Sequence, residues 1–193
     1  MRKLITIIAV VGLVWVGYTA WPLYDVMVLV RAIGDRNLQT ITRHVYFDAV
    51  RQSLAHQIAD AFVRRSGAQV PPLIQSQAAV ALGLADPVLK KLISPEALSD
   101  LLAAGWPVTA VSDPPPPGTV GITKASVGTV WDVYKRSDYG IGRFEVSLPS
   151  SLSPRQRFRL TFRLLQWRWQ LTSVILPEHI QNLLADELIK ARR

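Results

Sequence analysis

The chain has 193 residues, of which 49% are hydrophobic and 19% charged, and its formal net charge is +8. This length allows one membrane segment and one domain of about 150 residues, and the apolar content excludes a disordered tail. The absence of cysteine excludes disulfides, zinc–thiolate sites, iron–sulfur clusters and cysteine nucleophiles. In residues 114–193, twelve Lys and Arg face six Asp and Glu. Such a balance is typical of proteins that bind nucleic acid or an anionic surface, and also of surfaces whose arginines are only solvated.

The first element expected along the chain is a membrane-spanning helix. Residues 4–24 contain no charge, and about 20 helical residues cross the ~30 Å hydrocarbon layer of a bilayer. Aromatic rings that favour the membrane interface gather toward the distal end: Trp15, Tyr18 and Trp21. Pro22 supplies a stop or a kink. We therefore expect residues 1–23 to be a transmembrane anchor that contacts the membrane through residues 4–23.

A cleaved signal peptide is the main alternative, because it also has a basic start and an apolar middle. Cleavage after Ala20 would place Tyr18 at the −3 position, where a small residue is required. Trp21 and Pro22 would then directly follow the cut. The sequence therefore favours an uncleaved signal anchor.

Charges on either side of the span bear on its orientation. Arg2 and Lys3 favour a cytoplasmic N-terminus. Three arginines that follow the span would favour the opposite orientation: Arg31, Arg36 and Arg43. We expect these three to belong to a folded domain, whose charges influence topology less. The predicted location is the cytoplasmic (inner) membrane of a bacterium, crossed once, with the soluble domain in the periplasm.

A proline-rich connector, residues 113–119, divides the rest of the chain. Its four consecutive prolines cannot continue a helix or occupy a central strand, so an extended segment is expected. Apolar residues recur at helical spacing before it and mostly at alternate positions after it. We therefore expect a helical part at residues 24–112 and an antiparallel sheet with a C-terminal helix at residues 120–193. Residues 24–193 are expected to form one domain.

Capping residues indicate where the helices begin. A first helix ends at Gly34, and Asp35 caps a short second helix. The clearest helix has Asp48 as its cap and Gly67 at its end, and its apolar stripe contains Val50, Leu54, Ile58, Ala61 and Phe62. Two more helices are expected where a capping residue precedes a proline, and the second ends before a glycine: Asp86-Pro87, Ser94-Pro95 and Gly105.

After the connector the apolar period changes to two, which predicts four strands. The alternating residues are Val127, Thr129, Trp131 and Val133; Phe144, Val146 and Leu148; Phe158, Leu160, Phe162 and Leu164; and Trp167, Trp169 and Leu171. A turn is expected at residues 137–140, and Pro177 begins a last helix. The predicted fold class is α+β: an N-terminal transmembrane helix, several short helices, a four-stranded antiparallel meander sheet and a C-terminal helix, with helices on one face of the sheet. At least one strand tryptophan is expected in the core.

Residues able to perform catalysis are sparse. No glycine-rich phosphate loop, GxSxG elbow or HExxH motif occurs. His44 and His56 lie on separate predicted helices at a spacing that matches no familiar ligand pattern. Glu178 and His179 could form an acid–base pair, but a glutamate is favoured in the first turn of any helix. The sequence therefore predicts that the protein is not an enzyme and has no catalytic residue, metal site or cofactor.

A run of arginines is the one constellation that indicates binding. Four at even spacing are expected on one side of the third strand, and a fifth follows on the fourth: Arg155, Arg157, Arg159, Arg163 and Arg168. Such a row can bind phosphate groups of lipid or nucleic acid, or it can be a solvated face that discourages edge-to-edge pairing of sheets. Nucleic acid is not accessible to a periplasmic domain. Anionic lipid headgroups or an acidic envelope protein are the partners that remain.

Several landmarks occur in order along the chain: Val45–Leu54 (VYFDAVRQSL), Ser94–Leu98 (SPEAL), Arg143–Val146 (RFEV), Trp169–Thr172 (WQLT) and Leu176-Pro177. In these, and in an aromatic and proline patch at residues 21–24, the sequence resembles a bacterial family described as domain of unknown function 2939, over roughly residues 20–177. Gln166-Trp167 departs from the family pattern, which usually has a glycine-containing turn there. The resemblance implies an anchored envelope protein and brings no catalytic residues.

Two functions of different classes follow from these observations. The first is an uncharacterised single-pass, membrane-anchored envelope protein with a non-enzymatic binding or interaction domain. The alternative is a small-ligand-binding or hydrolytic domain with a pocket between sheet and helices, by analogy with cone-shaped folds. A third reading, a cytoplasmic domain whose arginines bind nucleic acid, requires the opposite orientation of the anchor.

Overall fold

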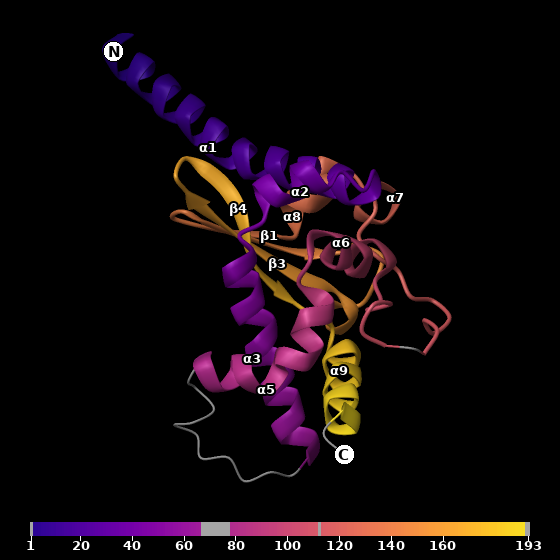
Figure 1. Ribbon diagram of the computed structural model, residues 1–193. Coiled ribbons are helices and arrows are strands. Elements are labelled where there is room, and N and C mark those ends of the chain that lie inside the picture. The colour runs from indigo at the N-terminus through magenta and orange to yellow at the C-terminus, as the bar shows by residue number, and fades with distance from the viewer. Residues whose placement is uncertain (1, 67–77, 112, 192–193) are drawn as a thin grey trace.

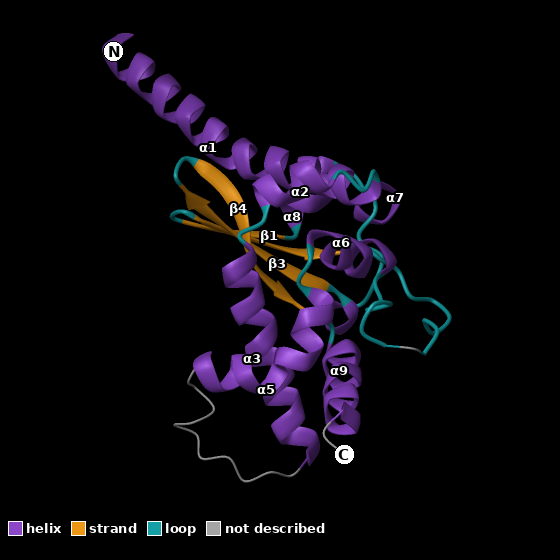
Figure 2. Cartoon of the chain, viewed as in Figure 1, coloured by secondary structure: helices purple, strands orange, loops and turns teal. Residues whose placement is uncertain are grey.

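The computed structural model describes residues 2–66, 78–111 and 113–191. Its elements, in chain order, are α1 (Arg2–Gly34), α2 (Leu38–His44), α3 (Phe47–Ser66), α5 (Ala78–Leu92), α6 (Pro95–Ala104), α7 (Lys124–Val127), α8 (Val130–Lys135), β1 (Ser137–Gly140), β2 (Arg143–Leu148), the 3-10 turn η1 (Pro154–Gln156), β3 (Phe158–Leu165), β4 (Arg168–Ile175) and α9 (Glu178–Ala191). Helix α1 projects beyond the domain at one end and α9 lies at the other (Figure 1). The predicted α+β class is confirmed (Figure 2).

Helix α1 is continuous over 33 residues but lies in two different environments. Its first half, up to Gly17, is exposed, and an 18-residue window of the helix has a mean hydropathy of 2.0 with no residue buried. Its second half joins the core through Leu23, Val26, Leu29, Val30 and Ile33. Of the stop or kink predicted at Pro22, the stop is absent, because burial of the turns that follow outweighs the hydrogen bond that proline cannot make. In the part of the chain that the structure describes, α1 is the one helix long and apolar enough to cross a membrane.

The two helices after α1 begin differently from the prediction. Helix α2 is capped by Asn37, whose side-chain oxygen accepts a backbone hydrogen bond at 3.1 Å, and not by Asp35. Helix α3 begins one residue before Asp48, so this carboxylate lies in the first turn, where it complements the helix dipole. The predicted apolar stripe is confirmed, with Val50, Leu54, Ile58 and Ala61 buried. Gly67, expected to end α3, lies outside the described residues.

The two predicted proline starts have opposite outcomes. Ser94 caps α6 by accepting a hydrogen bond from the backbone nitrogen of Ala97 at 3.0 Å, and Gly105 ends it in the left-handed region at φ 70°. The start at Asp86-Pro87 is wrong, because this pair lies inside α5. Helix α5 continues through the proline because its buried residues pack against the core on both sides of it: Ala85, Val88, Leu89 and Leu92.

The first predicted strand is wrong, since α7 and α8 occupy its residues. Thr123 caps α7 and Thr129 caps α8, and each exchanges reciprocal hydrogen bonds with a residue three positions later, Ser126 and Asp132. These local bonds outweigh the β preference of the valines, threonine and tryptophan in the segment. Residues 137–140, expected to form a turn, instead form β1.

The four strands form an antiparallel meander in the order β1-β2-β3-β4, as predicted. One face is apolar and almost completely buried in a core shared with α1, α3, α6 and α9: Phe144, Val146, Leu148, Phe158, Leu160, Phe162, Trp169 and Leu171. The opposite face presents Arg143, Glu145, Arg159 and Arg163. Of the strand tryptophans, Trp169 is in the core, whereas Trp167 is 81% exposed because it lies in the β3–β4 turn.

The outer edge of β4 is covered by polar groups around α3. Tyr46 donates its backbone N–H to Leu171 O at 2.9 Å. The side-chain amide of Gln57 donates to Val174 O at 2.9 Å and accepts from the backbone nitrogen of Leu176 at 2.8 Å. An unpaired strand edge is a site for association with other chains, and these contacts close it.

Candidate functional site

The structure divides the predicted arginine row among different environments. Arg155 lies in η1, before the strand begins. Arg157 turns back and donates from Nε to Leu152 O at 2.7 Å, so it clamps a loop. Arg159 and Arg163 remain on the outer face of β3, and Arg168 begins β4. A single straight row is therefore wrong, because η1 interrupts the extended backbone that the even spacing assumed.

A neighbouring strand supplies the partner of Arg163 on this outer face. Arg143 of β2 lies directly opposite Arg163 in the antiparallel register, at the separation of cross-strand neighbours. The predicted set lacked Arg143. The alternation in β2 could have predicted that Arg143 faces outward, because Phe144 and Val146 face inward at alternate positions. The sequence of neither strand, however, predicts which residues of the two strands pair.

The two arginines line one hollow of about 360 Å³ on the outer face of the sheet. Tyr46 and Ala49 form its wall on the side of α3, and Thr161, Ser173 and Ile175 contribute from β3 and β4. Two guanidinium groups beside hydroxyl groups make a site suited to a phosphate or carboxylate group.

Glu145 is the acidic group that pairs with arginines on this face, and Asp138 of β1 lies directly opposite it in the strand register. Glu145 accepts from Arg143 Nη2 at 2.7 Å and from Arg159 Nε at 3.2 Å. Across the face, two carboxylates, Glu145 and Asp138, lie among four arginines, which leaves a local charge of +2: Arg143, Arg159, Arg163 and Arg168. Arg163 pairs with β2 and β4 through its backbone, and within the described ranges its side chain has no hydrogen-bond or ion-pair partner, so its guanidinium donors are free to bind an anion.

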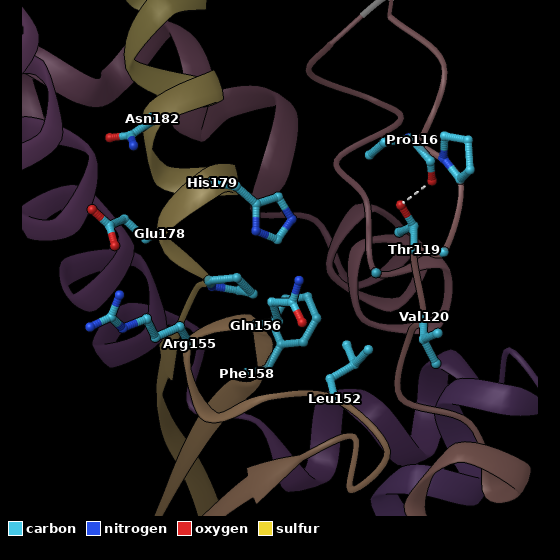
Figure 3. Close-up of a pocket in the computed structure, with 14 residues that line it drawn as sticks. Pro116, Thr119, Val120, Leu152, Arg155, Gln156, Phe158, Glu178, His179 and Asn182 are labelled. Atoms are coloured by element: carbon cyan, nitrogen blue, oxygen red, sulfur yellow. Dashed lines mark hydrogen bonds between the residues drawn. The ribbon is translucent and has the colours of Figure 1, made fainter.

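A second hollow of about 570 Å³ lies between the proline-rich connector, η1 and the start of α9 (Figure 3). Gln156, Phe158 and His179 point into it (Figure 3). Burial lowers the pKa of His179, which favours its neutral form. Thr119 across the hollow donates its hydroxyl to Pro116 O at 2.7 Å. This hollow is at the end of the sheet and not between sheet and helices, where the core side chains are packed.

The histidines are not brought together. His44 lies in α2, with Nε2 3.8 Å from an Asp25 carboxylate oxygen, His56 lies in α3, and His179 begins α9. Among the residues that the structure describes, no group of three or more His, Asp or Glu side chains could hold a metal ion.

Two hairpin turns lie beside α1 at Tyr18. The Tyr18 hydroxyl donates to Gly140 O at 3.0 Å and accepts from the backbone nitrogen of Gly142 at 2.9 Å, which ties α1 to the β1–β2 turn. The Tyr18 ring contacts that of Trp169, with centroids 6.3 Å apart, at the start of β4. Both turns expose a large apolar side chain: Ile141 is 104% exposed and Trp167 81%. Sequence patterns missed this cluster, because it depends on contacts between segments more than 120 residues apart.

Residues 11–101 match the family described as "Protein of unknown function (DUF2939)", which confirms the resemblance over this range. The match includes the buried half of α1 and the landmarks at residues 45–54 and 94–98, whereas the later landmarks lie beyond it. No curated protein and no solved structure matches the chain significantly.

Proposed function

We propose that this chain is a single-pass, membrane-anchored envelope protein whose non-enzymatic domain binds anionic groups at the hollow between Arg143 and Arg163. The observation that best supports the anchor is the contrast within α1. Its first half leaves large apolar side chains such as Ile8 and Leu13 more than 60% exposed, whereas the second half is packed in the domain. A contiguous apolar surface of this kind is stable in a bilayer and unfavourable in water.

The proposed orientation places the N-terminus in the cytoplasm and the domain in the periplasm. Arg2 and Lys3 precede the apolar segment, as the positive-inside rule requires. Arg36, which follows it, pairs with Asp100 of α6 at 3.2 Å and so belongs to the folded domain. Charges of a folded domain influence topology less than charges in short loops.

A topology reporter tests the orientation directly. Alkaline phosphatase, which is active only outside the cytoplasm, is fused after Arg193 of the full chain and compared with a cytoplasm-active reporter at the same position. We expect phosphatase activity in cells. Activity of only the cytoplasmic reporter would overturn the periplasmic placement. Nucleic acid would then be accessible to the domain as a partner.

Lipid phosphate is the anion that the position of the hollow favours. Arg143 is adjacent in sequence to Gly142. The backbone nitrogen of Gly142 donates a hydrogen bond to the hydroxyl of Tyr18, which lies inside the predicted span. A group one residue from this contact lies at the level of the lipid headgroups if α1 crosses the membrane. The local charge of +2 and the free donors of Arg163 fit a phosphodiester.

Native mass spectrometry of the detergent-solubilised full chain tests this binding. With added phosphatidylglycerol we expect lipid adducts that are several-fold more abundant than with phosphatidylcholine. The double substitution Arg143→Gln and Arg163→Gln is expected to remove most of this preference. Lys91→Gln with Lys124→Gln is the matched control, because it removes two exposed charges elsewhere. Equal adducts on both variants would contradict lipid binding at the hollow and favour an acidic protein partner.

The non-enzymatic part of the proposal is supported by the geometry of the connector hollow. His179 is the titratable base that points into it, and within the described ranges its ring forms no hydrogen bond to a hydroxyl or carboxylate. The nearby Thr119 hydroxyl is already donated to a carbonyl oxygen. Among the residues described around this hollow, no hydroxyl nucleophile is therefore paired with a base.

A further inference from the structure

The exposed part of α1 is shorter than a bilayer is thick. Residues 4–17 are exposed, and these 14 residues extend about 21 Å at 1.5 Å per residue. The hydrocarbon layer is about 30 Å thick, which leaves a deficit of about 9 Å. Tilting the helix would shorten its projection across the membrane and increase the deficit. Entry of the turns after Gly17 into the membrane would remove this deficit.

Those turns of α1 cannot enter alone. Tyr18 is hydrogen-bonded to Gly140 and Gly142 of the β1–β2 hairpin, and its ring packs against Trp169 beside the β3–β4 turn. The hairpin between β3 and β4 reaches up beside α1 (Figure 1). Any movement of Tyr18 toward the bilayer brings both hairpin turns with it.

The side chains at these turns are suited to the lipid interface. Ile141 and Trp167 are the tips, and both side chains are exposed. One arginine follows each tip within two residues along the chain: Arg143 follows Ile141, and Arg168 follows Trp167. An apolar or indole tip next to an arginine is a composition that proteins place at the boundary of hydrocarbon and headgroups.

A groove between α1 and the first of these tips extends the same surface. It has a volume of about 620 Å³ and is bounded by Val14 and Trp15 of α1 and by Tyr139 and Ile141 of the hairpin. It is continuous with the exposed half of α1. In a membrane such a groove is filled by lipid chains, whereas in water it would leave a large apolar area hydrated.

We propose that the tips Ile141 and Trp167 enter the interfacial layer of the bilayer that α1 crosses. This rests on the proposed anchoring and adds a second membrane contact to it. The domain then lies against the bilayer in one orientation, with the hollow of Arg143 and Arg163 at the headgroups, and does not swing on a linker.

Single cysteines test the proposal cleanly, because the chain has none of its own. Gly12→Cys, Ile141→Cys, Trp167→Cys and Lys190→Cys are each labelled with the polarity-sensitive dye NBD on the full chain in phosphatidylcholine–phosphatidylglycerol vesicles. Gly12 has open space for a side chain, and Lys190 lies on α9 at the far end from the span. Gln166→Cys is a second site in the β3–β4 turn if Trp167→Cys fails to fold.

We expect the emission maximum of NBD at positions 12, 141 and 167 to lie at a shorter wavelength than that of NBD at position 190. Lipids brominated near the headgroup should quench positions 141 and 167 most, and lipids brominated deep in the chains should quench position 12 most. Positions 141 and 167 that match position 190, while position 12 stays blue-shifted, would overturn the tip contact and leave the anchor intact. A water-exposed position 12 would overturn the anchor and the tip contact together.

Discussion

Tyr18 of α1 donates a hydrogen bond to the carbonyl oxygen of Gly140 at the end of β1, 3.0 Å away and 122 residues later in the chain. The same hydroxyl accepts from the backbone nitrogen of Gly142 at 2.9 Å. One side chain thus satisfies a donor and an acceptor of a tight hairpin turn. It also fixes the angle between the long helix and the sheet, because α1 continues without a break into the core.

Tyr18→Phe is expected to lower the free energy of unfolding by about 1–3 kcal/mol, because it leaves both backbone groups of the turn without their partner. Urea unfolding of the full chain in detergent micelles measures the change. Tyr24→Phe is the control, since that side chain is 69% exposed and should change the value by less than about 0.5 kcal/mol. Equal effects would show that the Tyr18 hydroxyl contributes nothing specific.

Gln57→Leu removes the side-chain amide that covers the edge of β4. It leaves Val174 O without a donor and Leu176 N without an acceptor, and we expect a loss of about 1–3 kcal/mol in unfolding free energy. Hydrogen exchange of the Leu176 amide should accelerate. Gln52→Leu, on the exposed side of the same helix, should leave that amide unchanged. Unaltered exchange in Gln57→Leu would contradict the role of Gln57 at the edge.

Gly121→Ala should prevent stable folding. An added Cβ would lie 1.9 Å from the carbonyl oxygen of Ala103, a backbone atom that cannot move without disturbing the end of α6. Gly83→Ala is the matched control, because nothing lies within 4 Å of its added Cβ. In α5 that change should stabilise the chain by about 0.5–1 kcal/mol. Comparable melting temperatures for the two variants would show that the close approach at Gly121 is not required.

Tyr139→Phe should keep or raise stability, because the Tyr139 hydroxyl is buried and has no hydrogen-bond partner in the described part of the chain. Burial, followed by the nearby Tyr134, raises the pKa of Tyr139 to about 12. The unfolded phenol loses its proton near pH 10 while the folded one keeps it, so the free energy of unfolding falls as pH rises from about 10 to about 12. Tyr139→Phe should weaken this alkaline loss, as followed by circular dichroism. A marked destabilisation at pH 7 would reveal a partner for the hydroxyl.

Local signals predicted much of the fold. The cap at Ser94 and the glycine after α6 define that helix by themselves, because capping and the left-handed C-terminus involve residues within a few positions. The alternation in β2 and β3 predicted their buried faces for the same reason. The predictions failed where two local preferences competed. Thr123 and Thr129 formed helix caps in a segment whose valines favoured a strand, and Pro87 was retained inside α5.

The candidate site was predicted only in part, because it is made by the pairing of strands. Arg163 was expected on an outer face, but Arg143 became its neighbour through the β2–β3 register. Arg155 and Arg157 do not lie in line with the arginines of β3, because η1 interrupts the extended backbone before that strand. The Arg157 side chain instead donates hydrogen bonds to carbonyl oxygens of its own loop. Spacing along one strand carries no information about either event.

The sequence by itself determined the long apolar helix, because hydropathy and helical length depend only on the residues within that segment. It determined the α+β class and the inward faces of three of the four strands for the same local reason. Only the tertiary structure decided where the exposed half of α1 meets the domain. The boundary lies at Tyr18, inside the apolar segment, because that side chain bonds to a turn 122 residues away. Contacts over such distances arise from packing of the whole chain, and they bring the two hairpin tips beside the exposed half of α1.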